Sequence, residues 1–365
     1  MTTNLGPGLG APLQAKLDEL KVPGAVVLVR SASHGEWSSA FGTRAIGGDE
    51  RVTMDDHIRI GSNTKTMTGV VILQLVQEGS IALDDPVAEH WPDVPNGRRI
   101  TIASMLEMRS GLYSYTLDEA FEARLDTEPG HAWHPTELLS IAFAHPPSFS
   151  PDAGYEYSNT NTVLLGLIVE QLTNQPLEEA FRQRIFKPLG LKETTMPAAG
   201  DTGIPTPHPR GYMFGTNEST LTEPGVPAWQ RAALADGTLR PNDFTDSSPS
   251  WAWAAGAAIS TAADLARYVE AVVDGELLHA DQQEKWLASF RPTGPEPTSP
   301  TYGYHLGQFG PLIGHTGQIP GFNSFMGRDP ERRNTVVLWT SLVSGPDGQM
   351  PVAELAKIIM GSLYA

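Results

Sequence analysis

The pattern of apolar and polar residues divides the chain into strand-rich ends and a helix-rich middle. An amphipathic stretch at residues 13–20 predicts a helix, and apolar stretches at 25–29 and 37–41, joined by a hairpin tip at 34–36, predict two strands. The same reasoning predicts helices at 100–108, 136–143, 163–172, 178–186, 263–273, 281–289 and 352–363, and strands at 302–309, 314–317, 324–328 and 335–340.

Strands at both ends with helices between them predict an α/β fold, in which helices flank an antiparallel sheet. On this division, residues 1–85 and 247–365 form a discontinuous α/β domain. Residues 86–246 form an inserted, mostly helical lobe. Its last part, residues 205–246, is rich in Pro, Gly, Thr and Asp and is expected to be a long irregular loop.

The most apolar helix is expected directly after Ser62, at residues 67–76, and such a helix is typically buried. Ser62 and Lys65 are three residues apart at its start and face the same side. Burial lowers the pKa of a lysine, so Lys65 can accept the proton of the Ser62 hydroxyl. The helix N-terminus favours an oxyanion. A Ser-x-x-Lys motif alone is common, and its alternative reading is a helix-capping Ser followed by a surface Lys.

A second motif, Tyr157-Ser158-Asn159, precedes another apolar helix. A lysine beside Tyr157 is expected to lower the pKa of its phenol, which can then carry a proton between serine and leaving group. Asn159 offers a donor and an acceptor that suit a substrate amide and the lysine. The alternative is a packed loop tyrosine followed by a turn asparagine.

A third motif, Gly314-His315-Thr316-Gly317, falls in a predicted strand. Its glycines are expected to let a substrate backbone approach and pair with the strand, although a plain turn is the alternative. The chain has no Gly-x-Ser-x-Gly motif, which argues against an α/β-hydrolase fold.

Composition narrows the classes of function. The 365 residues carry a net charge of −17, which argues against nucleic acid and anionic membranes as partners. Cysteine is absent, and no His or Asp spacing suits a metal, so neither thiol catalysis nor a metal site is expected. No apolar run is long enough to span a membrane. The first residues lack a signal-peptide pattern, which predicts a cytoplasmic protein, or an exported one whose signal is absent from this chain.

The three motifs in this order resemble those of the penicillin-recognising serine hydrolases. The branch with class C β-lactamases, D-alanyl-D-alanine carboxypeptidases and D-amino-acid amidases is the most similar, and residues 58–62, 109–112, 155–160 and 184–190 also read like it. The resemblance implies a β-lactamase/transpeptidase-like fold, a small-molecule or short-peptide substrate, and no cofactor.

The resemblance also implies roles for particular residues. Ser62 would be the nucleophile, with Lys65 and Tyr157 sharing the general base and acid roles. Asn159 would hold the substrate amide and Lys65. The remaining roles are a substrate-flanking strand of His315, Thr316 and Gly317, an oxyanion hole of the Ser62 and Gln318 N–H groups, and an acyl pocket lined by Phe121 and Trp251.

The chain departs from the carboxypeptidases of this branch where they bind a terminal carboxylate. Residues 302–309 contain no Arg or Lys, His305 is the only candidate cation there, and Gln318 stands where a hydroxyl residue is usual. This predicts a serine hydrolase of amides or esters next to a D-configured residue. The alternatives are a D-alanyl-D-alanine carboxypeptidase, a class C-like β-lactamase or esterase, and a penicillin-binding sensor without turnover.

Overall fold

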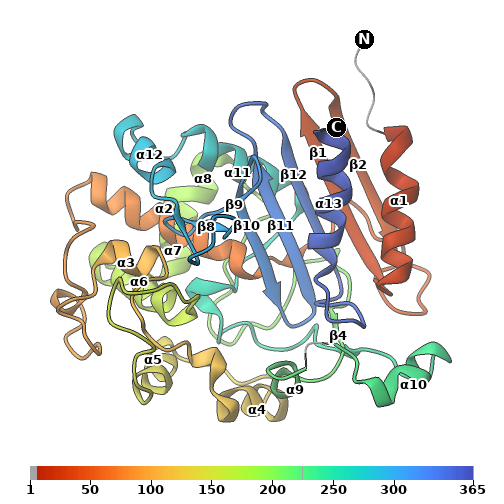
Figure 1. Ribbon diagram of the computed structural model, residues 1–365, viewed down its shortest axis with the longest axis horizontal. Helices are drawn as coiled ribbons and strands as arrows, with labels where there is room; N and C mark the ends of the chain where they lie inside the picture. The colour runs from red at the N-terminus through yellow and green to blue at the C-terminus, as the bar shows by residue number, and fades with distance from the viewer. Residues whose placement is uncertain (1–5, 224, 365) are drawn as a thin grey trace.

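A computed structural model describes residues 6–223 and 225–364, and an antiparallel sheet crosses it (Figure 1). The eight strands lie in the order β2-β1-β12-β11-β10-β9-β8-β7. Both ends of the chain contribute to the sheet, as expected from the sequence. The strands are β1 (Gly24–Ser31), β2 (Gly35–Gly42), β7 (Arg291–Pro292), β8 (Thr301–Tyr302), β9 (Gly307–Phe309), β10 (Leu312–Ile319), β11 (Phe322–Arg328) and β12 (Thr335–Thr340).

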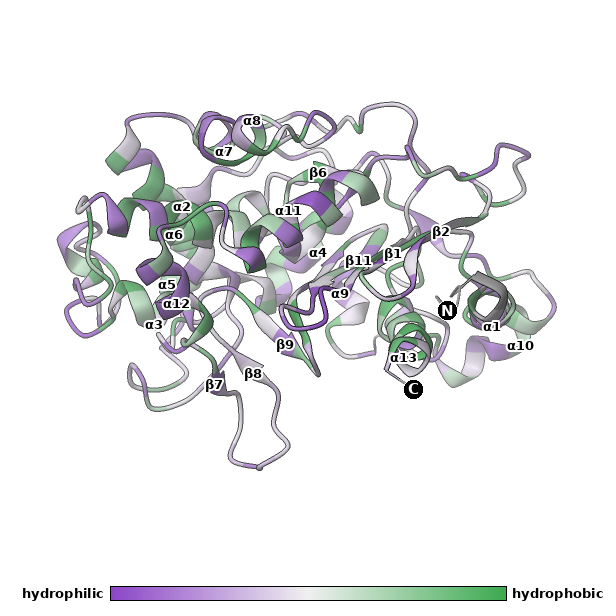
Figure 2. Ribbon diagram, turned by 90° about the horizontal axis from the view of Figure 1, so that it is seen from above, coloured by the Kyte–Doolittle hydropathy of each residue, from purple (hydrophilic) through white to green (hydrophobic). Residues whose placement is uncertain are grey.

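Helices cover both faces of this sheet (Figure 2). The helices α1 (Gly6–Glu19) and α13 (Pro351–Leu363) pack on one face, and α11 (Ala262–Asp274) lies on the other. The residues of β1 alternate between the two cores: Val27 packs with α1 and α13, and Val26 belongs to the larger core on the side of α11. A strand buried on both faces reads as a continuous apolar run, which is what the sequence of β1 shows. The antiparallel fold class predicted from the sequence is thereby confirmed.

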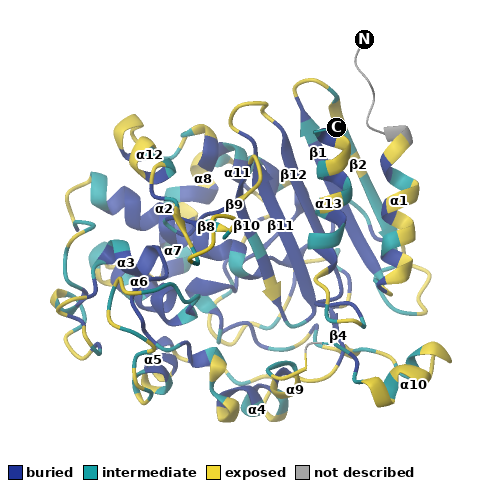
Figure 3. Cartoon of the chain, in the orientation of Figure 1, coloured by how far each residue is buried: buried dark blue, intermediate teal, exposed yellow. Residues whose placement is uncertain are grey.

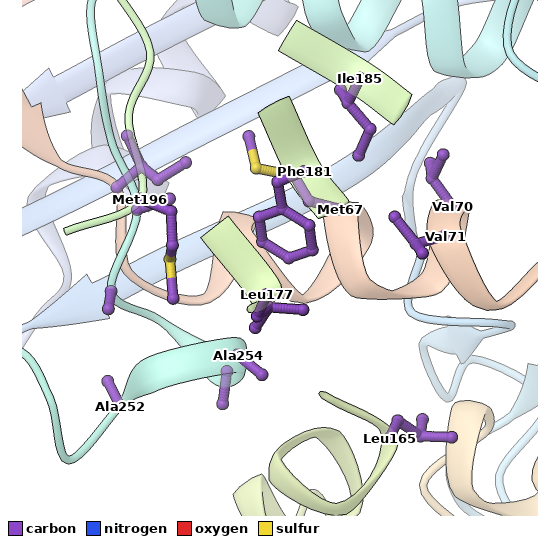
Figure 4. Close-up of a cluster of buried hydrophobic side chains, with 14 of the residues drawn as sticks. Met67, Val70, Val71, Leu165, Leu177, Phe181, Ile185, Met196, Ala252 and Ala254 are labelled. Atoms are coloured by element: carbon purple, nitrogen blue, oxygen red, sulfur yellow. The ribbon is translucent and has the colours of Figure 1, made fainter. Parts of the chain in front are cut away.

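Beside the sheet lies a group of helices around α2 (Thr64–Gln77) (Figure 1). Nearly all of α2 is buried, and Met67, Val70 and Val71 gather with Phe181 and Ile185 (Figure 4). The helix α2 is therefore the buried central element of this group of helices. The other helices are α3 (Ile102–Leu106), α4 (Glu119–Thr127), α5 (Pro135–Phe143), α6 (Asn159–Thr173), α7 (Leu177–Phe181), a π-helical turn (Arg182–Phe186), α8 (Lys187–Leu189) and α12 (Ala280–Leu287).

The segment 205–246 contains only short elements, as its composition predicted. They are β4 (Tyr212–Met213), α9 (Asn217–Thr220), a 3₁₀ turn (Ala228–Gln230), α10 (Arg231–Ala235) and β5 (Asn242–Asp243). A separate two-stranded ladder joins β3 (Ile58–Arg59) to β6 (Ile259–Ser260), which ties the start of the α2 region to the second half of the chain. The outer surfaces of α9 and α10 are exposed, whereas the central strands are buried (Figure 3).

The prediction of one continuous strand at residues 302–309 is wrong. The structure has two short strands, β8 and β9, which pair with each other across a turn at 303–306. His305 has a positive φ of 55° in this turn, and its backbone N–H donates to the carbonyl of Leu106. The backbone therefore bends toward α3 at this turn instead of continuing as a strand.

Within residues 6–223 and 225–364, no helix has the length and apolar character needed to cross a membrane. The division into a discontinuous α/β domain and an inserted lobe stays a prediction. The larger hydrophobic core contains residues of both parts, among them Ile58 and Leu164.

Candidate active site

Ser62 lies in a 3₁₀ turn, Gly61–Asn63, that leads directly into α2. Gly61 has a φ of 52°, and a Cβ at this position would lie 2.6 Å from the backbone nitrogen of Gln318. A side chain is therefore excluded both by the backbone conformation and by the strand β10. The turn packs against β10 so closely that the backbones of Ser62 and Gln318 border the same space.

Two glycines that the sequence motif highlighted serve the packing of the protein itself. A Cβ on Gly317 would overlap the carbonyl oxygen of Ile60, and one on Gly314 would overlap the carbonyl oxygen of Met326. The protein's own backbone therefore requires glycine at these two positions, and the expectation that they also let a substrate backbone approach stays a prediction.

Lys65 is completely buried one helical turn after Ser62. Its Nζ donates hydrogen bonds to Ser62 Oγ (3.0 Å) and to the carbonyl oxygen of Ala255 (2.7 Å). Burial lowers its pKa well below the usual value, because the charged form loses its hydration. A neutral amine beside the hydroxyl can accept its proton, as the sequence predicted.

Tyr157 approaches the same point from the loop before α6. Lys65 Nζ lies 4.9 Å from the centroid of its ring. Its hydroxyl is buried and has no hydrogen-bond partner in the described part of the chain. Burial raises the pKa of Tyr157, and the nearby Ser62 hydroxyl, although it does not meet hydrogen-bond geometry, offsets only part of this effect. The expected lowering of the tyrosine pKa by Lys65 is therefore wrong, because the lysine is itself held toward its neutral form.

Asn159, at the start of α6, makes no hydrogen bond to Lys65 in the described part of the chain. Its Nδ2 donates to Thr116 Oγ1 (3.1 Å), and the place expected for it next to Lys65 is taken by the carbonyl of Ala255. The amide of Asn159 still borders the cavity that contains Ser62.

Next to Ser62, one edge of the strand β10 has no partner strand among the described residues. Its neighbour β9 pairs only with Leu312–Gly314, so the described strands leave the segment from His315 to Ile319 unpaired on that side. Thr316 and Gln318 are the two positions of this segment with the most exposed side chains, and their two-residue spacing puts them on one face. An extended substrate can pair with this edge.

The two histidines of this region are both buried and neutral. His315 Nε2 lies 2.9 Å from the Tyr302 hydroxyl, and burial lowers its pKa to about 3. His305 lies against the carbonyl of Lys65 (Nδ1 to oxygen, 2.9 Å), and burial lowers its pKa to about 3 as well. The candidate cation proposed from the sequence is therefore a neutral core residue that supports α2.

A cavity of about 260 Å³ opens on one side of Ser62. Trp251 lines it, as the resemblance implied. Phe121 does not. It is buried behind the cavity, where its ring packs against Tyr115 (centroids 5.3 Å apart) and Trp133 (4.9 Å).

The side chain that enters this cavity is the next one along α4, Glu122, which the sequence reasoning missed. Burial raises its pKa to about 8, and the nearby Asp126 adds to the shift. Asp126 in turn accepts hydrogen bonds from Asn217, which also lines the cavity. Glu122 shares the buried face of α4 with Phe121 and Leu125. A carboxylate on the apolar face of a helix is the signal that could have identified it.

A second cavity, of about 270 Å³, lies on the other side of Tyr157. Tyr157 lines both cavities, and Ser62 lines only the first. Thr316 borders the second cavity and Gln318 the first, so the free edge of β10 passes both. Tyr157 thus lies between the two cavities.

In residues 6–223 and 225–364, no three His, Cys, Asp or Glu side chains come together in a way that could hold a metal ion. The Ser62 hydroxyl lies beside an amine held toward its neutral form and near a neutral phenol, and the oxyanion hole of the Ser62 and Gln318 N–H groups stays a prediction. This set suits acyl transfer to serine.

Comparison with known proteins agrees with this chemistry. A family model described as Beta-lactamase matches residues 11–357. The D-stereospecific amidohydrolase from Streptomyces sp. superimposes with a TM-score of 0.82 at 30% identity, and the match covers 98% of each chain. The D-amino acid amidase from Ochrobactrum anthropi SV3, complexed with L-phenylalanine, gives a TM-score of 0.80 at 27% identity over 98% of this chain and 99% of that one.

The curated relatives include esterase EstB from Burkholderia gladioli, which is 29% identical over 309 residues, or 75% of this chain and 76% of the esterase. Several other curated relatives are longer, and the chain matches 62% of their length.

Proposed function

The chain belongs to the Beta-lactamase family of serine hydrolases, and we propose that it hydrolyses amides of D-amino acids with a free α-ammonium group, through an ester on Ser62. The family resemblance drawn from the three motifs is confirmed by the match over residues 11–357. The observation that carries the proposed substrate is the buried carboxyl of Glu122 in the cavity beside Ser62.

Formation of the acyl-enzyme uses the contacts around Ser62. Ser62 Oγ attacks the carbonyl carbon of the substrate, and its proton passes to the neutral Nζ of Lys65, 3.0 Å away. The carbonyl oxygen takes up negative charge next to the N–H groups of Ser62 and Gln318, where preorganised donors stabilise it.

Departure of the amine completes the step. The unpaired hydroxyl of Tyr157 donates its proton to the leaving nitrogen and takes back the proton held by Lys65. The C–N bond breaks, the amine leaves, and the acyl group remains on Ser62. Water then attacks the ester, with the same groups moving the proton in reverse, and the amino acid is released.

Glu122 supplies a partner for the α-ammonium of the acyl group. The pKa of about 8 belongs to the free site, and an entering ammonium favours the carboxylate form. Hydrogen bonds to charged groups contribute about 1.5–3 kcal/mol, enough to distinguish a free amino acid amide from its N-acylated form. The D-configuration is supported by the names of the amidohydrolase and amidase above.

A substrate that ends in a free carboxylate is disfavoured. Among the described residues that line the two cavities, none is Lys or Arg, and His305 and His315 are neutral. A carboxylate would lose hydration there without gaining a cation. This argues against the D-alanyl-D-alanine carboxypeptidase alternative.

The proposal is tested with D- and L-phenylalanine amide, N-acetyl-D-phenylalanine amide and a D-alanyl-D-alanine peptide. We expect the D-amide to give the highest kcat/KM and Ser62→Ala to abolish turnover. The proposal fails if the N-acetylated amide is hydrolysed equally well, or if the free-acid peptide is preferred tenfold.

Ester hydrolysis is a second candidate function, favoured by the likeness to esterase EstB. A p-nitrophenyl ester that turns over faster than the D-amide, relative to the uncatalysed rates, would support it. A penicillin-binding sensor would instead give one burst of product and a stable adduct on Ser62.

A further inference from the structure

We propose that the cavity beyond Tyr157 is a leaving-group subsite that takes an uncharged aromatic or bulky apolar amine. The inference rests on the proposed function, in which Ser62 forms an ester with the acyl part of the substrate. It adds the chemical class of the part that leaves.

The position of the cavity follows from the free edge of β10. Gln318 borders the cavity that contains Ser62 and Glu122, and Thr316, two residues earlier on the same face, borders the second cavity. Two residues of strand span about 6.6 Å, so a substrate extended along this edge reaches both hollows. With the acyl group beside Glu122 and the scissile carbonyl at Ser62, the leaving group enters the space beyond Tyr157.

Five of the eleven described residues that line this second cavity carry a ring, namely Tyr155, Tyr157, Tyr302, Phe309 and His315. The ring of Tyr302 lies 5.9 Å from that of Tyr155 and 5.7 Å from that of His315, centroid to centroid. The Tyr302 hydroxyl and His315 Nε2 pair with each other at 2.9 Å. Because these polar atoms are already paired, the walls offer ring surfaces to a ligand. Such surfaces favour another ring, which adds stacking or edge contacts to the burial of apolar area.

Phe309 presents an apolar ring at the rim of this cavity. It lines the cavity from β9 and is 38% exposed, although exposed large apolar side chains are few among the described residues. One side of its ring packs against Phe325, with centroids 5.3 Å apart. An apolar leaving group would cover the part that now faces solvent.

Charge is absent from the lining. None of the described residues that form it is Lys, Arg, Asp or Glu. An arginine near the lining is Arg109, whose guanidinium lies 5.8 Å from the Tyr155 ring centroid. Its NH groups donate to the carbonyls of Pro292 (2.5 Å) and Gly154 (3.4 Å), so it is held outside the cavity. A leaving group with a carboxylate would therefore find no counter-charge.

The test compares three substrates with one acyl group: the methylamide, benzylamide and 4-carboxybenzylamide of D-phenylalanine. We measure kcat/KM, which includes the step that expels the leaving group. We expect kcat/KM for the benzylamide to exceed that for the methylamide about tenfold, because an apolar pocket gains from each extra apolar group that it binds. For the 4-carboxybenzylamide, kcat/KM should fall back toward the value for the methylamide.

Two variants examine the cavity directly. Phe309→Ala should reduce the benzyl-to-methyl ratio several-fold, whereas Trp229→Ala, which removes a 78% exposed ring outside both cavities, should leave it unchanged. Gln308→Lys adds a cation at an exposed position of the lining and should raise kcat/KM for the 4-carboxybenzylamide relative to the benzylamide.

The outcomes separate this inference from the function on which it rests. If wild-type protein hydrolyses the methylamide and benzylamide equally well, or if neither cavity variant changes the ratios, the subsite is refuted and the proposed function stands. If no D-phenylalanine amide is hydrolysed, both are refuted.

Discussion

Replacement of Glu122 by glutamine should raise the free energy of unfolding and, at the same time, lower kcat/KM for D-amino acid amides. The carboxyl has a pKa of about 8 in the folded chain, against an ordinary pKa of 4.5 for glutamate. The folded state therefore keeps this proton over a pH range in which the unfolded state releases it. Consequently, this group lowers the free energy of unfolding as pH rises from about 4.5 to 8.

Glutamine has the same shape and no proton to release. The difference in unfolding free energy between Glu122→Gln and wild type should therefore grow with pH, by roughly 2 kcal/mol between pH 5 and pH 7 for a single proton with this shift. The direction is fixed by the raised pKa: the variant gains stability relative to wild type toward higher pH.

Urea denaturation at pH 5, 6 and 7 measures this difference, with the fluorescence of the eight tryptophans as the signal. Glu119→Gln is the matched control, because Glu119 is an exposed carboxylate of the same helix. In parallel, Glu122→Gln should lower kcat/KM for D-phenylalanine amide about 10- to 100-fold, and that for the N-acetylated amide much less. If the unfolding free energies of Glu122→Gln and wild type change in parallel with pH, Glu122 is not a buried carboxyl with a raised pKa. If kcat/KM falls equally for the free and the N-acetylated amide, Glu122 does not bind the α-ammonium group.

Three further predictions concern the groups around Ser62. Lys65→Ala, Tyr157→Phe and the double variant should lose similar amounts of acylation rate, because residues that act as a unit are non-additive; losses that add in logarithm would show separate roles. The acid limb of the kcat/KM profile should lie well below the usual lysine pKa, because activity needs neutral Lys65 and is lost as pH falls through its lowered pKa; a limb near 10 would contradict this. Gly61→Ala should destabilise the protein by at least about 1–2 kcal/mol in thermal unfolding, because of its positive φ and the closeness of Gln318, whereas Gly10→Ala, with open space around its Cβ, should not; equal melting temperatures would contradict the close packing of the turn.

The parts that the sequence predicted well are those set by local periodicity. The three-residue spacing of Ser62 and Lys65 fixes their relation because both belong to one helix, and an all-apolar helix had to be buried. Alternation and apolar runs likewise gave the strands at both ends of the chain. These predictions needed no knowledge of which distant segments meet.

The features that the sequence did not predict all depend on contacts between segments that are distant in the sequence. The carbonyl that binds Lys65 comes from Ala255, 190 residues away, and nothing in the local pattern identifies it. Residues 302–309 have a strand-like composition, yet the contact of His305 with the Lys65 carbonyl breaks the strand. Glu122 enters the cavity because tertiary packing turns the apolar face of α4 toward Ser62, which propensity alone does not determine.

The titratable groups around Ser62 share one property that explains how they could work together. Burial shifts the pKa of Lys65 down and the pKa values of Tyr157 and Glu122 up, so each is pushed toward its neutral form. The resting site therefore holds no charge in a region that solvates charge poorly, and the ammonium of Lys65 and the oxyanion form only while the substrate reacts. When an ammonium enters, Glu122 can release its proton and balance the new positive charge.

The net charge of the protein favours the same substrates as the cavities around Ser62. A net charge of −17 creates a field that attracts cations and repels anions over distances of about a Debye length. An amino acid amide approaches as a cation, and an N-acylated peptide with a free carboxylate approaches as an anion. The long-range field and the cation-free cavities therefore act in the same direction, and both favour a substrate that is charged only at its α-amino end.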